Sequence, residues 1–172
     1  MKLKRQLGGK TDYRKRLVFI KSRKPRLVVR KSSKEISAQV IEYFPEGDKI
    51  IASATTKELV KLGYTGGGKN IPAAYLLGLM IAKKTNEKNI KEVTPDIGFH
   101  APISGSRVFA VLHGAKEGGL NFSIDKSVVP DIKRLNGEHI VAYAKKEGSK
   151  FSHQQDELPK KIEAIKRQLT EK

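Results

Sequence analysis

The stretch TDYRKRLVFIKSRKPRLVVRKSSKEISAQVIEYF, residues 11–44, predicts how the fold begins. From Tyr13 to about Ser22, apolar residues recur at helical spacing between basic ones, and Thr11 suits the N-cap position. Pro25 ends this helix, because a proline pushes the preceding residue out of the helical region. A basic helix therefore leads directly into the segment that follows.

That segment predicts an antiparallel meander. Arg26–Lys31 (RLVVRK) is typical of a strand, and a turn at residues 32–35 leads to Ser37–Phe44, which alternates cleanly between two faces. The turn residues at 45–48 precede a third strand, Lys49–Thr55. Short turns join consecutive strands, so all three are expected to pair side by side.

The middle of the chain predicts helices packed on this sheet. A short helical turn at residues 56–62 is followed by a glycine run, and Asn70 then caps a helix to about Lys84 that is apolar nearly all round. Lys91–Ile97 is expected to be a fourth strand, parallel to a neighbour because a helix crosses over before it. A further helix runs from Ser104 or Ser106 to about Lys116.

The last third of the chain predicts two more helices. We expect Asn136 to cap a helix that continues through Lys146. Residues 148–157 are polar and typical of a linker, and Pro159–Leu169 carries a thin apolar stripe at helical spacing.

Charge is distributed unevenly along the chain. Residues 1–34 contain fourteen Lys or Arg and one acidic residue, so this fifth of the chain carries +13 of the total +17. Such asymmetry predicts a polyanionic partner that meets the N-terminal end first. A solvated surface helix and a basic helix lying on an anionic membrane are the alternatives for residues 13–22.

The composition excludes several classes of site. The chain has no cysteine, which removes disulfides, thiolate metal ligands and cysteine nucleophiles and fits a cytoplasmic protein. No apolar run is long enough to cross a membrane, and the start lacks the apolar core of a signal peptide. The four histidines have no metal-ligand spacing, so we expect neither a metal nor a cofactor.

The run Gly63–Asn70 raises the possibility of a nucleotide-hydrolysing enzyme. It matches the phosphate-loop pattern G-x-x-x-x-G-K-[ST] except at Asn70, where a hydroxyl normally holds Mg²⁺. The residues before it indicate a helix instead of the buried strand that this loop requires. The sequence leaves open a purely structural turn or a loop whose N–H groups and Lys69 hold an RNA phosphate.

Nucleic acid is the partner that the residues favour. Lys and Arg neutralise phosphates, and Tyr13, Tyr43 and Tyr64 lie near basic residues where they could stack on unpaired bases. Charge alone also fits a general DNA-binding architectural protein. No zinc finger, helix-turn-helix or RNP aromatic signature is present in the sequence.

The motifs together resemble one family over nearly the whole chain, in order. The matching segments are Thr11–Leu17 (TDYRKRL), Lys24–Ser32 (KPRLVVRKS), Ala38–Ile41 (AQVI), Ala52–Ala54 (ASA), the glycine loop, Asn70–Gly78 (NIPAAYLLG), Asp96–Gly98 (DIG), Gly105–Ala110 (GSRVFA) and Gly137–Ile140 (GEHI). This pattern is similar to universal large-subunit ribosomal protein eighteen in its archaeal form, which is related to eukaryotic large-subunit protein five.

The resemblance implies a fold and a division of the chain. The fold would be α/β, with three layers and a mixed sheet that begins with the antiparallel meander, in a ribonuclease H-like architecture. Residues 1–24 would form a basic N-terminal arm and helix, 25–147 an α/β RNA-binding core, and 148–172 a C-terminal linker and helical extension.

The resemblance also implies a function without catalysis. The protein would be a structural constituent of the large ribosomal subunit that binds 5S rRNA and helps attach it to 23S rRNA in the central protuberance. Its partners would be these two RNAs and neighbouring large-subunit ribosomal proteins, in the cytoplasm and without a membrane.

The expected RNA contacts come from the basic segment, the hairpin and, secondarily, the glycine loop. Lys21 and Lys34 are included because they continue the same charged segment. The full set is Arg14, Lys15, Arg16, Lys21, Arg23, Lys24, Arg26, Arg30, Lys31, Ser32, Lys34, Lys69 and Asn70.

Overall fold

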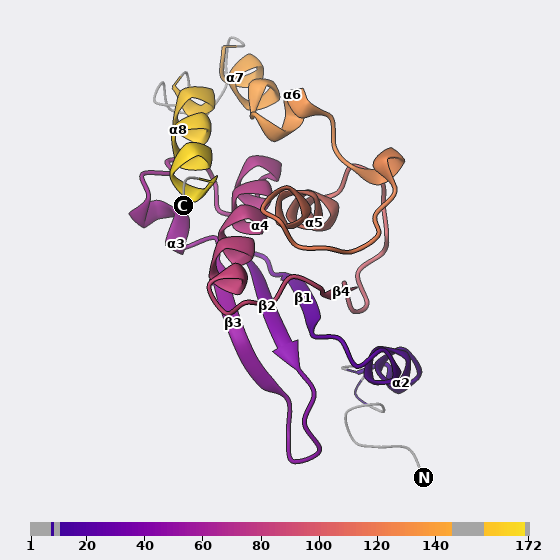
Figure 1. The fold of residues 1–172 in the computed structure, drawn as a ribbon. Helices are drawn as coiled ribbons and strands as arrows, with labels where there is room; N and C mark the ends of the chain where they lie inside the picture. Colours follow the sequence, from indigo (N-terminus) through magenta and orange to yellow (C-terminus); the bar gives the residue numbers. More distant parts are fainter. Residues whose placement is uncertain (1–7, 9–10, 146–156, 171–172) are drawn as a thin grey trace.

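The computed structural model describes Gly8, residues 11–145 and residues 157–170 (Figure 1). The elements are, in order, α2 (Tyr13–Lys21), β1 (Arg26–Lys31), β2 (Ile36–Glu42), β3 (Lys49–Thr55), α3 (Glu58–Lys61), α4 (Ile71–Asn86), β4 (Thr94–Asp96), α5 (Arg107–Glu117), the short 3₁₀ helix η1 (Lys126–Val128), α6 (Ile132–Leu135), α7 (Glu138–Ala144) and α8 (Leu158–Thr170). The expected linker at 148–157 lies almost entirely outside the described residues.

The four strands form one mixed sheet in the order β3-β2-β1-β4. β1, β2 and β3 pair antiparallel, with Val29 opposite Ala38 and Ala38 opposite Ala54. β4 pairs parallel to β1, with Leu27 opposite Pro95. These pairings confirm the predicted meander and the predicted parallel fourth strand.

The fourth strand is shorter than predicted, at three residues instead of seven. Pro95 has no N–H to donate to a neighbouring strand, and Gly98, with φ of 63°, turns the chain away directly afterwards. Before the strand, Glu92 forms an isolated bridge with Asn121 instead of pairing with β1, so β4 begins only at Thr94.

One face of the sheet is covered by α4 and α5, while α2 lies beside the opposite face near β1 and β4 (Figure 1). Leu27, Val29, Ala38 and Val40 point into the covered face and are fully buried. The alternation that predicted two faces for the second strand is therefore confirmed.

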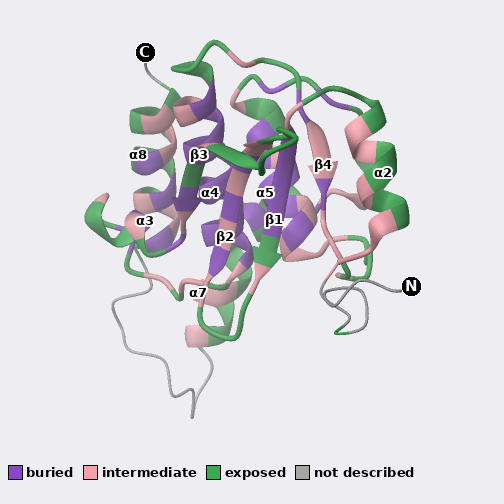
Figure 2. Ribbon diagram, turned by 90° about the horizontal axis from the view of Figure 1, so that it is seen from below, coloured by how far each residue is buried: buried purple, intermediate pink, exposed green. Residues whose placement is uncertain are grey.

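Helix α4 forms the centre of the core. Every residue from Ile71 to Ala82 is buried, as its all-round apolar sequence predicts (Figure 2). The Asn70 side chain caps it by accepting from the N–H of Ala73 at 2.9 Å. It crosses α5 closely enough that a Cβ on Gly78 would lie 2.2 Å from the carbonyl oxygen of Val111.

Two predicted helix starts are wrong. Asp12, not Thr11, is the N-cap of α2, because its carboxylate accepts from the N–H groups of Arg14 and Lys15. Asn136 is the C-cap of α6 and not the N-cap of the next helix; the expected helix is present as α7, but its N-cap is Gly137. Gly137, with φ of 78°, then turns the chain in the left-handed region and separates α6 from α7.

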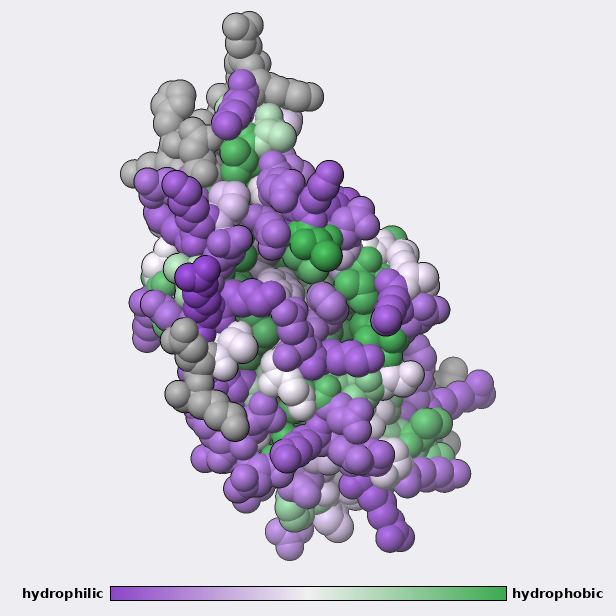
Figure 3. Space-filling view, turned by 45° about the horizontal axis from the view of Figure 1, so that its top comes forward, coloured by the Kyte–Doolittle hydropathy of each residue, from purple (hydrophilic) through white to green (hydrophobic). Residues whose placement is uncertain are grey.

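The terminal helix α8 packs on α4, with Leu158, Ile162 and Ile165 buried. This confirms the predicted apolar stripe. On the face drawn in Figure 3, hydrophilic residues cover most of the surface and hydrophobic residues form small separate groups between them. No helix within the described ranges is long and apolar enough to cross a membrane.

Candidate nucleic-acid interface

Helix α2 carries four of the predicted contact residues and has no buried residue of its own (Figure 2). Leu17 and Val18 are 54% and 65% exposed, so the apolar spacing of this helix does not mark a side that packs into the core. Arg14 and Lys15 are exposed, and their side chains have no ion-pair partner among the described residues. Both cations are therefore available to a ligand.

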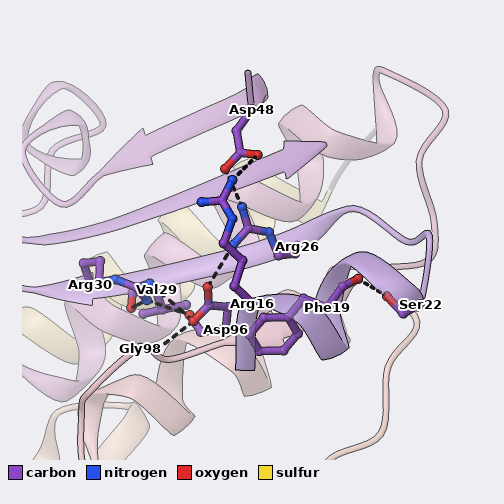
Figure 4. A network of polar contacts seen from close by, with 9 residues as sticks. All are labelled: Arg16, Phe19, Ser22, Arg26, Val29, Arg30, Asp48, Asp96 and Gly98. Carbon is purple, nitrogen blue, oxygen red and sulfur yellow. Dashed lines mark hydrogen bonds and ion pairs between the residues drawn. The ribbon is translucent and has the colours of Figure 1, made fainter. Parts of the chain in front are cut away.

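Three arginines and two aspartates link α2 to the sheet (Figure 4). Asp48, just before β3, accepts from Arg16 at 3.0 Å and from Arg26 at 2.7 Å. Asp96, at the end of β4, lies 3.4 Å from Arg26 and 3.3 Å from Arg30. Three cations share two carboxylates, so the network keeps a net positive charge.

Arg26 is the centre of this network and is structural. Its side chain is 10% exposed, and that of Asp96 is 9% exposed, so each charge needs the other inside the fold. The Nε atom of Arg26 is buried without a hydrogen-bond partner, although both terminal nitrogens are bonded. The predicted RNA contact at Arg26 remains a prediction, and its observed partners are protein carboxylates.

Arg30 has a mixed environment. One terminal nitrogen donates to the backbone oxygens of Val29 and Asp96, at 2.9 and 2.8 Å. Its side chain nevertheless remains 44% exposed. A cleft of about 260 Å³ lies between α2 and this part of the sheet, with Lys15 and Phe99 among its walls.

The β1–β2 turn places further cations at the opposite end of β1. The Ser32 hydroxyl donates to the Glu35 carbonyl at 2.9 Å and accepts from the N–H of Lys34 and Glu35. Ser32 therefore holds the turn, while the Lys34 side chain is exposed without an ion-pair partner in the described chain.

His100 also supports this end of β1, and the sequence did not single it out. Its Nε2 accepts from the backbone N–H of Lys31 at 3.1 Å. Burial lowers the pKa of His100, and the positive charges of Lys31 and Arg30 lower it further. A neutral imidazole is the form that can accept this bond.

The glycine loop has a structural explanation. Tyr64 is buried, and its hydroxyl donates to Asn70 at 2.7 Å, which fixes the cap of α4. A Cβ on Gly66 would lie 2.5 Å from that hydroxyl, so only glycine allows the loop to pass over Tyr64. The loop follows helix α3 instead of a strand. This arrangement differs from a nucleotide phosphate loop.

Lys69 nevertheless stays exposed at the start of α4. Its backbone carbonyl oxygen accepts from Arg107 at 3.0 Å, and its side-chain amino group has no partner in the described part of the chain. A Cβ on Gly68 would lie 3.5 Å from the carbonyl oxygen of Lys34, so the glycine loop and the β1–β2 turn are neighbours. Lys34 and Lys69 therefore belong to one basic surface.

The predicted contact residues thus fall into two groups at opposite ends of β1, about 17 Å apart for a six-residue strand. We call them the helix end and the turn end. The helix end contains Arg14, Lys15, Arg16, Lys21, Arg23, Lys24 and Arg26. The turn end contains Lys31, Ser32, Lys34, Lys69 and Asn70, and Arg30 lies between the two.

Two acidic residues that hold this interface were not predicted. From the sequence, Asp48 was expected only within the turn at residues 45–48, and Asp96 appeared only in the family-like segment Asp96–Gly98. They lie 22 and 70 residues from Arg26 along the chain, so no local pattern could pair them. In the described ranges, no group of three or more His, Cys, Asp or Glu side chains could hold a metal ion.

Comparisons with known proteins find clear relatives. Residues 1–93 match the model of a family described as ribosomal large subunit proteins 60S L5 and 50S L18. The chain is also 49% identical, over 142 residues, to the large ribosomal subunit protein uL18 of Ignicoccus hospitalis. That alignment covers 82% of this chain and 69% of the relative.

Proposed function

Because the chain belongs to the family of ribosomal large subunit proteins 60S L5 and 50S L18, we propose that it binds 5S rRNA as a constituent of the large ribosomal subunit. In this role it helps attach 5S rRNA to 23S rRNA in the central protuberance, beside neighbouring large-subunit proteins. It acts in the cytoplasm and as a structural protein, not as an enzyme.

The exposed cations at the two ends of β1 are the observation that carries this proposal. Arg14, Lys15, Lys34 and Lys69 keep their side chains at the surface without acidic partners in the described chain. The carboxylates nearby, Asp48 and Asp96, are already neutralised by arginines. These two carboxylates therefore do not oppose the approach of an RNA backbone to the exposed cations.

The rigid body behind this surface suits RNA recognised by its shape. Folded RNA is read through its outline, phosphates and unpaired bases, which requires cations held in a fixed arrangement. The Arg–Asp network ties α2 to three strand ends, and the buried helix α4 supports the sheet. The strand order, with only β1 and β4 parallel, supports the inference of a three-layer, ribonuclease H-like architecture.

The test compares nucleic acids under one condition. The full chain should bind 5S rRNA in preference to duplex DNA of equal length at about 150 mM salt, where weak surface attraction is screened. Footprinting of the complex then locates the contacts on the RNA. Equal affinity for both would indicate a general architectural protein and would contradict the proposal.

A separate measurement addresses the enzymatic alternative. The melting temperature should not change when ATP or GTP is added at millimolar concentration, because a bound ligand would stabilise the fold. Stabilisation by either nucleotide, lost when Lys69 is replaced by Ala, would contradict the structural role given to the Gly63–Asn70 loop.

A further inference from the structure

A second, smaller cleft lies where the end of α2 faces the end of β2. Its volume is about 140 Å³, and Arg26 of the Arg–Asp network forms part of its wall. Phe19 and Tyr43 supply aromatic walls, Arg23 and Lys24 supply cations, and Glu42 supplies a carboxylate.

The aromatic walls are built into the fold in different ways. Phe19 is half-buried on α2, and its carbonyl accepts from the Ser22 hydroxyl at 2.6 Å as the helix ends. Tyr43 directly follows β2 and remains 43% exposed. Of the three tyrosines that the sequence suggested for stacking, Tyr64 is buried and hydrogen-bonded, so it cannot meet a base.

Arg23 forms its side of the cleft in an unusual backbone conformation. Its φ of 53° lies in the left-handed region, directly after the helix C-cap, where glycine is the usual residue. An arginine there is strained, because its Cβ crowds the backbone in this conformation. Strain of this kind is typical of functional positions, and here it keeps a cation at the mouth of the cleft.

The polar groups match a nucleobase better than a phosphate alone. Glu42 makes no side-chain hydrogen bond or ion pair within the described chain, so it is free to accept from a ligand N–H. An unpaired phosphate would be repelled by this carboxylate, whereas base amino groups donate to it. Lys24 already pairs with Glu92 at 2.8 Å and Arg26 with Asp48 at 2.7 Å, so Arg23 is the cation of this cleft that has no ion-pair partner among the described residues.

We propose that this cleft binds one unpaired, amino-bearing base of the RNA partner. The base stacks on Tyr43, Glu42 accepts from its amino group, and Arg23 binds the adjoining phosphate. The proposal rests on the proposed function and adds a site that reads a base to the cations that bind the backbone.

The test measures the affinity of the full chain for 5S rRNA over a range of salt concentrations. Tyr43→Ala should weaken binding about tenfold, because stacking of a base on an aromatic ring is lost. Tyr43→Phe keeps the ring and should bind as the unchanged protein does. The slope of log affinity against log salt should stay the same in both, because no phosphate contact is removed.

Phe44→Ala is the matched control. Phe44 adjoins Tyr43, is 42% exposed and does not line the cleft, so its loss should leave affinity unchanged. Circular dichroism checks that each variant is folded. Zero-length ultraviolet crosslinking of the complex should also attach a nucleotide to Tyr43.

Two results would overturn the inference. One is an unchanged affinity of folded Tyr43→Ala for 5S rRNA. This would mean that the cleft binds a protein side chain or no ligand. The other is an equal loss in Tyr43→Ala and Tyr43→Phe. Failure of the unchanged protein to bind 5S rRNA would instead overturn the proposed function, so the two failures are distinguishable.

Discussion

At the scale of single residues, charge at this interface has two different uses. Arg14 keeps its guanidinium in solvent, while Arg26, twelve positions later, is 8% exposed between Asp48 and Asp96. Both residues look alike in the sequence, since each lies within the same basic segment. Burial separates the arginine that holds the fold from the one that can reach a ligand.

We expect Arg26→Met to lower the free energy of unfolding by about 3 kcal/mol or more, because it leaves buried Asp96 with less compensation. Arg14→Met is the control and should change stability by less than about 0.5 kcal/mol. Urea unfolding followed by circular dichroism measures both. Equal stabilities for the two variants would contradict the structural role of Arg26.

At the scale of elements, the crossing of α4 and α5 depends on two glycines that face each other. A Cβ on Gly114 would lie 2.2 Å from the carbonyl oxygen of Tyr75, and one on Gly78 would meet the backbone of α5. Glycine inside a helix is normally unfavourable by about 1 kcal/mol relative to alanine. The close approach of the two helices reverses that preference.

Gly78→Ala should therefore destabilise the protein by about 1–3 kcal/mol, because the helices must move apart. Gly67→Ala is the control, since a Cβ there meets nothing within 4 Å. Thermal unfolding of the two variants gives the comparison. A stabilised Gly78→Ala protein would mean that the helices are not in such close contact.

Helix α8 is attached to the α4–α5 pair by a polar contact as well as by its apolar stripe. The Tyr75 hydroxyl donates to Glu117 at 2.6 Å, and Lys166 lies 2.6 Å from the other carboxylate oxygen. Burial alone would raise the pKa of Glu117, but the hydrogen bonds from Lys166 and Tyr75 outweigh it, so the pKa lies below 4.5.

A lowered pKa in the folded state means that this carboxylate stabilises the protein above about pH 4.5, and that its contribution disappears as pH falls through the folded value. The difference in unfolding free energy between the unchanged protein and Glu117→Gln should therefore shrink between about pH 7 and about pH 3. Urea titrations at both values measure it. A difference that stays constant would show that the charge of Glu117 does not hold α8.

The predictability of these elements follows from how local their causes are. β1 and β3 have the predicted bounds because apolar runs and turn residues lie within a few positions of each other. The short helix α6 was missed, and the N-cap of α7 was placed one residue early, because Asn136 suits the start of a helix as well as the turn that ends one. The bonds of Asp48 and Asp96 were missed because their partners are distant in sequence.

The candidate site likewise contains features that could be predicted from local sequence and features that could not. The sequence could indicate that the N-terminal end is cationic, and the exposed side chains of α2 agree with that reading. It could not show that Arg26 is buried while neighbouring cations are exposed. It also could not show that the Tyr64 hydroxyl is hydrogen-bonded to Asn70, the cap of α4. Those distinctions require tertiary contacts. The division at residues 24 and 148, and the RNA contacts themselves, stay predictions.

At the scale of the whole molecule, the fold displays a strongly asymmetric charge on a rigid body. The helix end and the turn end of β1 are separated by about six strand residues, so one RNA surface can contact both. Arg16 is less suitable for charge reversal than Arg14, because a glutamate there would face Asp48. Arg14 and Lys15 are both free of such partners among the described residues.

Arg14→Glu combined with Lys15→Glu should weaken 5S rRNA binding at least tenfold and reduce the salt slope in magnitude by about two. Lys88→Glu combined with Lys91→Glu makes the same change in net charge at exposed positions outside the predicted contact set. This control should bind much more tightly than the first variant. Filter binding at several salt concentrations measures both affinities. Equal losses of affinity would mean that binding depends on net charge and not on the positions of Arg14 and Lys15.

The parallel pairing of β1 with β4 also has a consequence for biosynthesis. The meander is complete at Thr55, but Asp96 follows Arg26 by 70 residues. Because the chain is synthesised from its amino terminus, Arg26 and Arg30 are exposed before their counter-ion Asp96 has been translated. Until β4 docks, the nascent chain therefore carries more uncompensated positive charge at this site than the folded protein does.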